Sequence, residues 1–242
     1  MDKTSDIKSI SDMENGLCQE AELKYGDFFT NATDFLSLVN DFINDISLDG
    51  WIFTMFLGQF NKHSTLAILS AVRLHHLQGM LNARMALEAG ANAAYAIYNR
   101  NDEGFIKKLD GDLIEAVSPG KRYKWLEENF KEGSEAMKNL KGLINDTSAH
   151  SNMIYAFSNW KMEDKGFHYL LFDLEQDSGK IVKADLWHIA NIMMGTLDLF
   201  YGVNEKYKLM NFKPDFVARL KRYEAKNLEL KEVVMKMPKV KF

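Results

Sequence analysis

The segment from Met80 to Asn99 constrains the fold of this chain more than any other, because small side chains dominate it. It contains Ala83, Ala86, Ala89, Gly90, Ala91, Ala93, Ala94 and Ala96. A helix with so little side-chain bulk lets neighbouring helices approach closely. We therefore expect this segment to be the central helix of a bundle.

Long helices are expected on both sides of this segment. The chain contains only three prolines, and from Leu23 to Ile43 apolar residues recur every three or four positions, as an amphipathic helix requires. The predicted helices span residues 20–48, 51–77, 80–99, 105–109, 121–130, 134–152, 186–203 and 214–237. Glycine is common at helix ends, so Gln78-Gly79 marks the break after the second helix. The predicted fold class is all-α, a multi-helix bundle.

A different pattern occurs near residues 167–183. Phe167–Leu174 is rich in aromatic and β-favouring residues, and Asp177-Ser178-Gly179 followed by Lys180–Val182 is typical of a turn and a return strand. We predict one small β-hairpin insertion there. Residues 1–18 are polar and aperiodic, which predicts a flexible amino-terminal segment ahead of a single helical domain over residues 19–242.

Composition excludes several classes of protein. The net charge of −4 gives no global electrostatic reason to bind nucleic acid, although a local basic patch is compatible with it. The single cysteine, Cys18, excludes an intramolecular disulfide. The amino terminus lacks the apolar core of a signal peptide, and charged residues interrupt every apolar run before it reaches the roughly 18 residues of a membrane span. We expect a cytoplasmic protein without membrane contact.

Familiar cofactor and metal motifs are missing from the sequence. It has no phosphate loop, dinucleotide fingerprint, zinc-finger spacing or nucleophile elbow. No glutamate is followed three residues later by histidine, as the di-iron motif of helical bundles requires. No cofactor and no metal site of these kinds is therefore predicted.

A polar stripe on the alanine-rich helix is the first candidate site. Arg84, Glu88, Asn92 and Tyr95 are separated by four, four and three residues, which aligns them on one helical face. One interpretation is a structural ion pair between Arg84 and Glu88. The other is a cleft in which Arg84 holds an anion and Glu88 orients it or transfers protons, with Asn92 and Tyr95 as binding residues.

The second candidate is the polar run from Asn145 to Asn152. Asp146 and His150 are four residues apart, so on a helix they share a face and could hydrogen-bond or bind a metal together. The amide and hydroxyl groups of Asn145 and Ser151 add binding capacity. A structural hydrogen bond of His150 near a helix end is the alternative interpretation.

These two regions carry a family resemblance. Leu81–Ala89, with its Arg-x-x-x-Glu pair, and the later Tyr123–Leu126 and Ser148–Ser151 resemble, in order and type, a group of uncharacterised bacterial helical proteins. That group is similar to the HEPN superfamily of helical domains, found in toxin–antitoxin and antiviral systems. Many members are metal-independent ribonucleases. The resemblance covers roughly residues 51–157.

The chain departs from the family pattern at one position. The HEPN signature is an arginine, a polar residue directly after it, and a histidine four to six residues after the arginine. This chain keeps Asp146 and His150 but has Asn145 in place of the arginine. Asparagine cannot stabilise phosphate charge as arginine does, so either activity is absent or Arg84 supplies the charge from another helix.

Three hypotheses follow from the resemblance and the residues. The first is a non-catalytic or weakly catalytic module that binds a nucleotide, RNA or a protein partner, as a homodimer. The second is a metal-independent ribonuclease in which Arg84 stabilises the phosphate and His150 acts as acid or base, with Glu88 at the same site. The third uses Glu88, Asp146 and His150 as metal ligands.

Overall fold

The computed structural model describes residues 6–101, 105–109, 112–115, 119–148, 160–163, 166–169 and 179–236. Its helices are α1 (Ile7–Tyr25), α2 (Asp27–Asp41), α3 (Trp51–Val72), α4 (His76–Tyr98), α5 (Pro119–Asn129), α6 (Lys131–Ser148), α8 (Lys180–Tyr207) and α9 (Phe216–Lys236), with a short 3-10 helix η2 (Leu48–Gly50). The strands are β1 (Ile43–Ile46), β2 (Ile106–Leu109), β3 (Asp112–Glu115), β4 (Trp160–Glu163), β5 (Gly166–Tyr169) and β6 (Met210–Phe212). The predicted all-α multi-helix class is confirmed.

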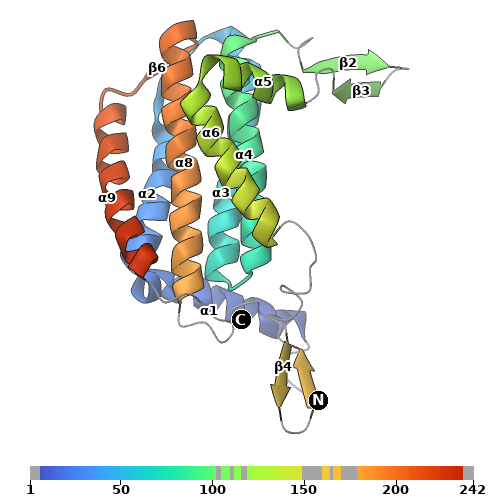
Figure 1. Ribbon diagram of the computed structural model, residues 1–242, viewed down its shortest axis with the longest axis vertical. Helices are drawn as coiled ribbons and strands as arrows, with labels where there is room; N and C mark the ends of the chain where they lie inside the picture. The colour runs from blue at the N-terminus through green and yellow to red at the C-terminus, as the bar shows by residue number, and fades with distance from the viewer. Residues whose placement is uncertain are drawn as a thin grey trace.

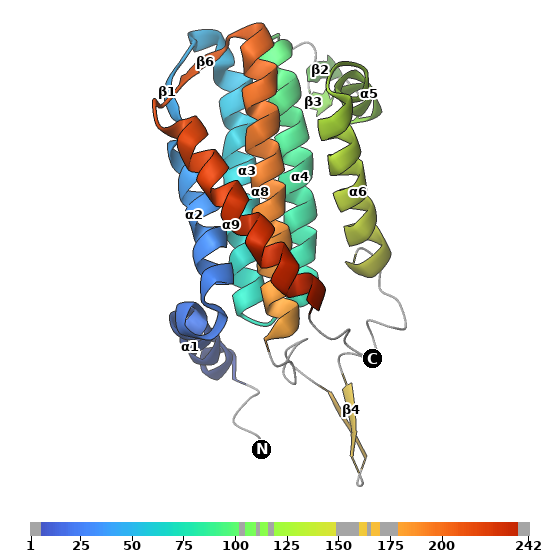
Figure 2. The same cartoon turned by 60° about the vertical axis from the view of Figure 1, so that its left-hand side comes forward.

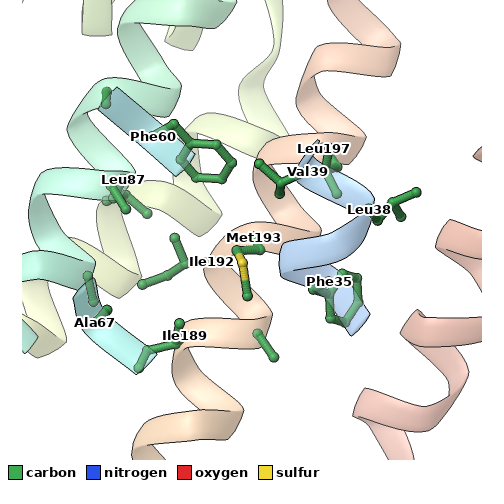
Figure 3. Packing of buried hydrophobic residues seen from close by; sticks show 14 of the residues in the cluster. Phe35, Leu38, Val39, Phe60, Ala67, Leu87, Ile189, Ile192, Met193 and Leu197 are labelled. Atoms are coloured by element: carbon green, nitrogen blue, oxygen red, sulfur yellow. The ribbon is translucent and has the colours of Figure 1, made fainter. Parts of the chain in front are cut away.

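Four long helices form the centre of the bundle. Helices α2, α3, α4 and α8 lie side by side along its length, α6 flanks α4, and α1 lies across one end (Figures 1 and 2). Their facing sides bury large apolar residues such as Phe35, Phe60, Leu87 and Met193 (Figure 3). None of the helices in the described ranges is long and apolar enough to cross a membrane.

The alanine-rich helix α4 has the central place that the sequence predicts. It packs against α3, α8, α5 and α6. Its small residues permit close approach: a Cβ added at Gly90 would lie 2.6 Å from Thr196 Cγ2 of α8. At Gly79 an added Cβ would lie 3.4 Å from the backbone oxygen of Ala67 in α3, which is an ordinary van der Waals distance. The close packing therefore requires glycine at Gly90 but not at Gly79.

Helix α9 is held against α2 and α8 by buried polar groups. Asn31 Nδ2 donates to Asn227 Oδ1 at 3.0 Å, and Trp187 Nε1 donates to the backbone oxygen of Asn227 at 2.9 Å. Near the start of α9, Arg219 forms an ion pair with Asp41 of α2 at 3.2 Å. These contacts fix α9 along the bundle (Figure 2).

Strands β1 and β6 join the chain after α2 to the chain after α8. They pair antiparallel, with Ile43 opposite Phe212 and Ile46 opposite Met210. Asn204 fixes the turn that leads into β6, because its Oδ1 accepts hydrogen bonds from the backbone nitrogens of Leu209 and Met210 at 2.8 and 3.0 Å. The sequence pattern did not predict this pairing.

The structure corrects several predicted boundaries. Helix α1 begins at Ile7, within the stretch expected to lack regular structure, and Gly26, with φ +53°, separates it from α2. The break between the second and third predicted helices lies at Arg73–His75, where Leu74 has φ +67°, and Gly79 is inside α4. Residues 106–109, expected to be helical, form strand β2, which pairs with β3.

The predicted hairpin is present at a different position. Strand β5 pairs with β4, which precedes it in the chain, with Trp160 opposite Tyr169. Lys180–Val182, expected to be the return strand, is the first turn of α8. Gly179 marks this helix start, and its φ of +83° is a conformation that glycine adopts without strain.

Candidate functional site

The polar stripe of α4 meets α6 at Glu88. Arg84 Nε donates to Glu88 Oε1 at 3.3 Å, which confirms the predicted pair on α4. Lys141 of α6 approaches the same carboxylate oxygen, with its Nζ at 3.0 Å. Two cations from two helices therefore share one oxygen. We call Arg84, Glu88 and Lys141 the cationic site.

The cationic site is partly open to solvent. The side chains of Arg84, Glu88 and Lys141 are 31%, 32% and 28% exposed. Partial burial raises the pKa of the Glu88 carboxyl, but the hydrogen bonds and charges of Lys141 and Arg84 outweigh it, so the pKa lies below its ordinary value. Glu88 is therefore ionised at neutral pH and unsuited to act as a general acid.

Tyr123 of α5 borders the cationic site. Its ring centroid lies 4.8 Å from Lys141 Nζ, a cation–π contact. Burial and then the Glu88 carboxylate raise the pKa of the phenol to about 12, partly opposed by Arg84 and Arg122. The hydroxyl is buried, and the described part of the chain provides no hydrogen-bond partner for it. Tyr123 is thus a protonated donor beside two cations.

A buried arginine lies next to Tyr123 on the same helix. Arg122 is only 1% exposed, and its Nη1 donates to Asn92 Oδ1 of α4 at 2.6 Å. Its guanidinium carbon lies 5.3 Å from the ring centroid of Phe105. Asn92, predicted to bind a ligand, is therefore engaged in holding α5 against α4.

Tyr95, the last residue of the predicted stripe, lies among aromatic rings. Its ring centroid is 5.3 Å from that of Trp125 and 5.6 Å from that of Phe105, both in edge-on geometry. The stripe thus changes along α4, from charged at Arg84 to aromatic at Tyr95. The structure brings all four stripe residues to the side of α4 that faces α5 and α6.

The second candidate region is described only in part. Asn145 lies one turn after Lys141 on α6, and its Oδ1 is buried without a hydrogen-bond partner in the described residues. Asp146 belongs to α6, but its side chain lies outside the described part of the structure. His150 and Ser151 also lie outside the described residues. Their predicted roles remain predictions.

A second polar cluster joins α4 and α8. His76 Nδ1 lies 2.7 Å from Oδ2 of Asp185, whose side chain is 3% exposed. The helix predicted over residues 186–203 would begin just after Asp185, whereas Asp185 lies inside α8 and its side chain faces His76 of α4. His188, one turn further along, has a lowered pKa because of burial, which the Asp185 carboxylate opposes and His76 reinforces. The contacts described for this cluster involve none of the residues of the cationic site.

The sequence did not identify Lys141 as a residue of the cationic site, or Arg122 and Tyr123 as its neighbours. Lys141 precedes Asn145 by one helical turn, and this spacing could have placed it on the same face as a predicted binding residue. Nothing in the local sequence distinguishes Arg122 from the exposed Lys121 or Lys124 beside it, because only the packing of α5 on α4 decides which of them is buried.

The chemistry of this face suits an anion better than a metal ion. Among the described side chains, Arg84 and Lys141 bring two positive charges to the carboxylate of Glu88, and cations repel a metal ion. Among the described residues, no three His, Cys, Asp or Glu side chains are grouped to hold a metal. No protein-family model matches this chain, and no curated protein or solved structure shows significant similarity to it.

Proposed function

We propose that this chain is a HEPN-like helical module of a bacterial defence or toxin–antitoxin type system, and that it binds the phosphate groups of RNA or a nucleotide at the cationic site. One observation carries the proposal. Arg84 and Lys141 reach the same oxygen of Glu88 from two helices, yet each side chain stays about a third exposed. Both charges are held in place and remain accessible to a ligand.

A purely structural role explains this arrangement less well. A partly exposed ion pair contributes only about 0–1 kcal/mol to stability, and a second cation on the same oxygen adds repulsion between the cations. A phosphate would relieve that repulsion. The Arg84 guanidinium uses its Nε–H for Glu88 and carries four further N–H donors in the planar geometry that suits phosphate.

The test is RNA binding by a double variant, Arg84→Gln with Lys141→Gln. Binding of a fluorescently labelled single-stranded RNA is measured by anisotropy at several salt concentrations. We expect the variant to lose at least about tenfold in affinity, and the slope of log affinity against log salt to fall by about one for each phosphate contact removed.

A matched control separates a site from general electrostatics. Lys124 and Lys131 form exposed ion pairs with Glu128 and Glu135 one turn further along their helices. The double variant Lys124→Gln with Lys131→Gln removes the same charge and the same number of ion pairs. Equal losses of affinity in the two double variants would contradict a site at Arg84 and Lys141.

Ribonuclease activity is the alternative function. Arg84 is partly exposed beside α6, and His150 follows the end of α6 by two residues in the sequence. In this alternative Arg84 stabilises the phosphate while His150 transfers a proton. An RNA cleavage assay with His150→Ala decides the matter, since cleavage that survives this substitution would remove the alternative.

Metal binding by Glu88, Asp146 and His150 has less support. Glu88 already pairs with Arg84 and Lys141, and these cations would have to move before a metal could approach it. Elemental analysis of the purified protein tests this hypothesis directly. A stoichiometric metal that is lost in Glu88→Gln would revive it.

Assembly and location belong to the same proposal. We propose a cytoplasmic homodimer, as the resemblance to HEPN domains implies. Light scattering measures the molar mass in solution and is independent of RNA binding. A monomeric protein that binds neither nucleotide nor RNA at any salt concentration would overturn the proposed function as a whole.

A further inference from the structure

A cluster of aromatic rings lies at the carboxyl end of α4, beyond the cationic site. Tyr98 stacks on Trp125 of α5 with ring centroids 4.7 Å apart and planes at 16°. Tyr207, at the end of α8, lies 5.0 Å from Tyr98 and 6.1 Å from Trp125. We call Tyr98, Trp125 and Tyr207 the aromatic platform.

The aromatic platform combines an exposed ring with neighbouring cations. Tyr98 is 44% exposed, although it belongs to the most buried helix of the bundle. Lys206 Nζ lies 5.3 Å from the ring centroid of Tyr207. Arg100 Nη2 donates to the backbone oxygen of Tyr207, while its Nη1 pairs with the carboxylate of Asp49 at 2.9 Å. Aromatic rings interleaved with cations are the surface that single-stranded nucleic acids use, because each base stacks while its phosphate is neutralised.

The aromatic platform and the cationic site lie along the same helix. Glu88 and Tyr98 are ten residues apart on α4, a rise of about 15 Å. Tyr95 connects them, because it aligns with Arg84 on the helix and its ring contacts both Tyr98 and Trp125. Helices α5 and α6 follow this same side of α4 (Figure 2). The two sites are therefore ends of one seam.

We propose that the seam binds single-stranded RNA, with one base stacked on the aromatic platform and the backbone held at the cationic site. The inference rests on the proposed function and narrows its ligand. Nucleotides stacked as in a duplex are about 3.4 Å apart, and those of an extended strand are further apart, so about 15 Å corresponds to at most about four nucleotides. A mononucleotide cannot occupy both ends. The ligand that uses the whole seam is a strand.

The experiment compares two probes of equal length and charge. One is a labelled single-stranded octanucleotide RNA, and the other is a sugar–phosphate chain that lacks bases. We expect Tyr98→Leu to weaken binding of the RNA by about 5-fold to 150-fold, the range for the loss of one stacked base, and to leave the base-free chain unaffected. Tyr98→Phe keeps the ring and should bind the RNA as the natural protein does.

The outcomes separate this inference from the proposed function. If Tyr98→Leu binds the RNA normally, or if the natural protein binds the two probes equally well, the platform takes no base, while phosphate binding at the cationic site still stands. If the natural protein binds neither probe, both proposals fail. If a nucleoside monophosphate competes as strongly as the octanucleotide, the inference that the ligand is a strand is overturned, and the ligand is a single nucleotide. Thermal melting of Tyr98→Leu verifies that the variant is folded.

Discussion

The two sides of α4 differ in packing, polarity and exposure to solvent. Toward α3 and α8 the helix presents alanines and Gly90, which pack so closely that a single added Cβ would collide with Thr196. Toward α5 and α6 it presents Arg84, Glu88 and Asn92, with partial exposure and shared hydrogen bonds. The first side is packed like a protein core, and the second is charged and partly open to solvent, as a binding surface is.

This difference separates residues that stabilise the fold from residues available for binding. Close packing contributes several kcal/mol for each large apolar side chain that is buried, whereas exposed ion pairs contribute about 0–1 kcal/mol. Buried polar atoms without a partner cost about 1–3 kcal/mol each. Tyr123 Oη and Asn145 Oδ1 are two such atoms in the described residues, both next to the cationic site. The packed side has such an atom too, Thr196 Oγ1 beside Gly90, so exposure and charge distinguish the two sides better than unpaired polar atoms do.

The largest expected effect comes from the packed side. Leu87 is 1% exposed and packs in the bundle core (Figure 3). Leu87→Ala should lower the free energy of unfolding by about 2–5 kcal/mol, because it removes buried apolar area and leaves a cavity. Denaturant unfolding measures the loss. Met85, on the same helix but 46% exposed, is the matched control, and Met85→Ala should change stability by less than about 0.5 kcal/mol.

The next largest effect on stability tests the close approach of α4 to α8. A Cβ at Gly90 would lie 2.6 Å from Thr196 Cγ2, so Gly90→Ala should destabilise the protein by about 1–3 kcal/mol through overpacking. Gly58, in the middle of α3, has no atom within 4 Å of its added Cβ. Gly58→Ala should therefore stabilise the protein by about 0.5–1 kcal/mol. Thermal melting that shifts in the same direction for both variants would contradict the packing described for α4.

The stability of the protein should depend on pH through His188 of α8, near the contact of α8 with α4. The pKa of His188 is lowered in the folded protein, first by burial, so the unfolded protein binds the proton more tightly. Stability should be full above the ordinary pKa of about 6.5 and fall as the pH decreases from there toward the folded pKa. His188→Gln should lose this part of the pH dependence of stability, so its Tm should drop less between about pH 7 and pH 5. An identical drop in both proteins would show that His188 does not titrate as described.

The smallest effect on stability is expected on the polar side. The double variant Arg84→Gln with Lys141→Gln removes two partly exposed ion pairs to Glu88. Its free energy of unfolding should change by no more than about 2 kcal/mol, or about 1 kcal/mol for each pair. Chemical denaturation checks this value on the same protein that is used for RNA binding. A loss of several kcal/mol would mean that the cationic site is structural, against the contrast drawn between the two sides.

Much of the fold follows from local sequence pattern. Apolar periodicity and the scarcity of proline predicted most of the long helices, and the alanine-rich composition predicted the central place of α4. The Arg84–Glu88 pair followed from helical spacing. The same reasoning placed the helix break at Gly79, because glycine is common at helix ends, but this glycine lies inside α4, next to α3.

The remaining features depend on contacts between distant segments. Lys141 joins Glu88 because α6 packs on α4, and Asp185 faces His76 because α8 does. Strands β1 and β6 pair across more than 160 residues, as Ile43 with Phe212, and no local pattern encodes that partner. Leu74 adopts a positive φ without being a glycine, so the break at Arg73–His75 has no sequence signal.

The most direct test of the claim that the polar side of α4 binds phosphate is the RNA affinity of Glu88→Gln. Removing the carboxylate removes its repulsion on a phosphate held by Arg84 and Lys141, which is worth about 1 kcal/mol at about 4 Å in water. We predict roughly fivefold tighter RNA binding, with little change in Tm. A Glu88→Gln protein that binds RNA no more tightly and is several kcal/mol less stable would contradict the account, and would show that Glu88 holds α4 and α6 together.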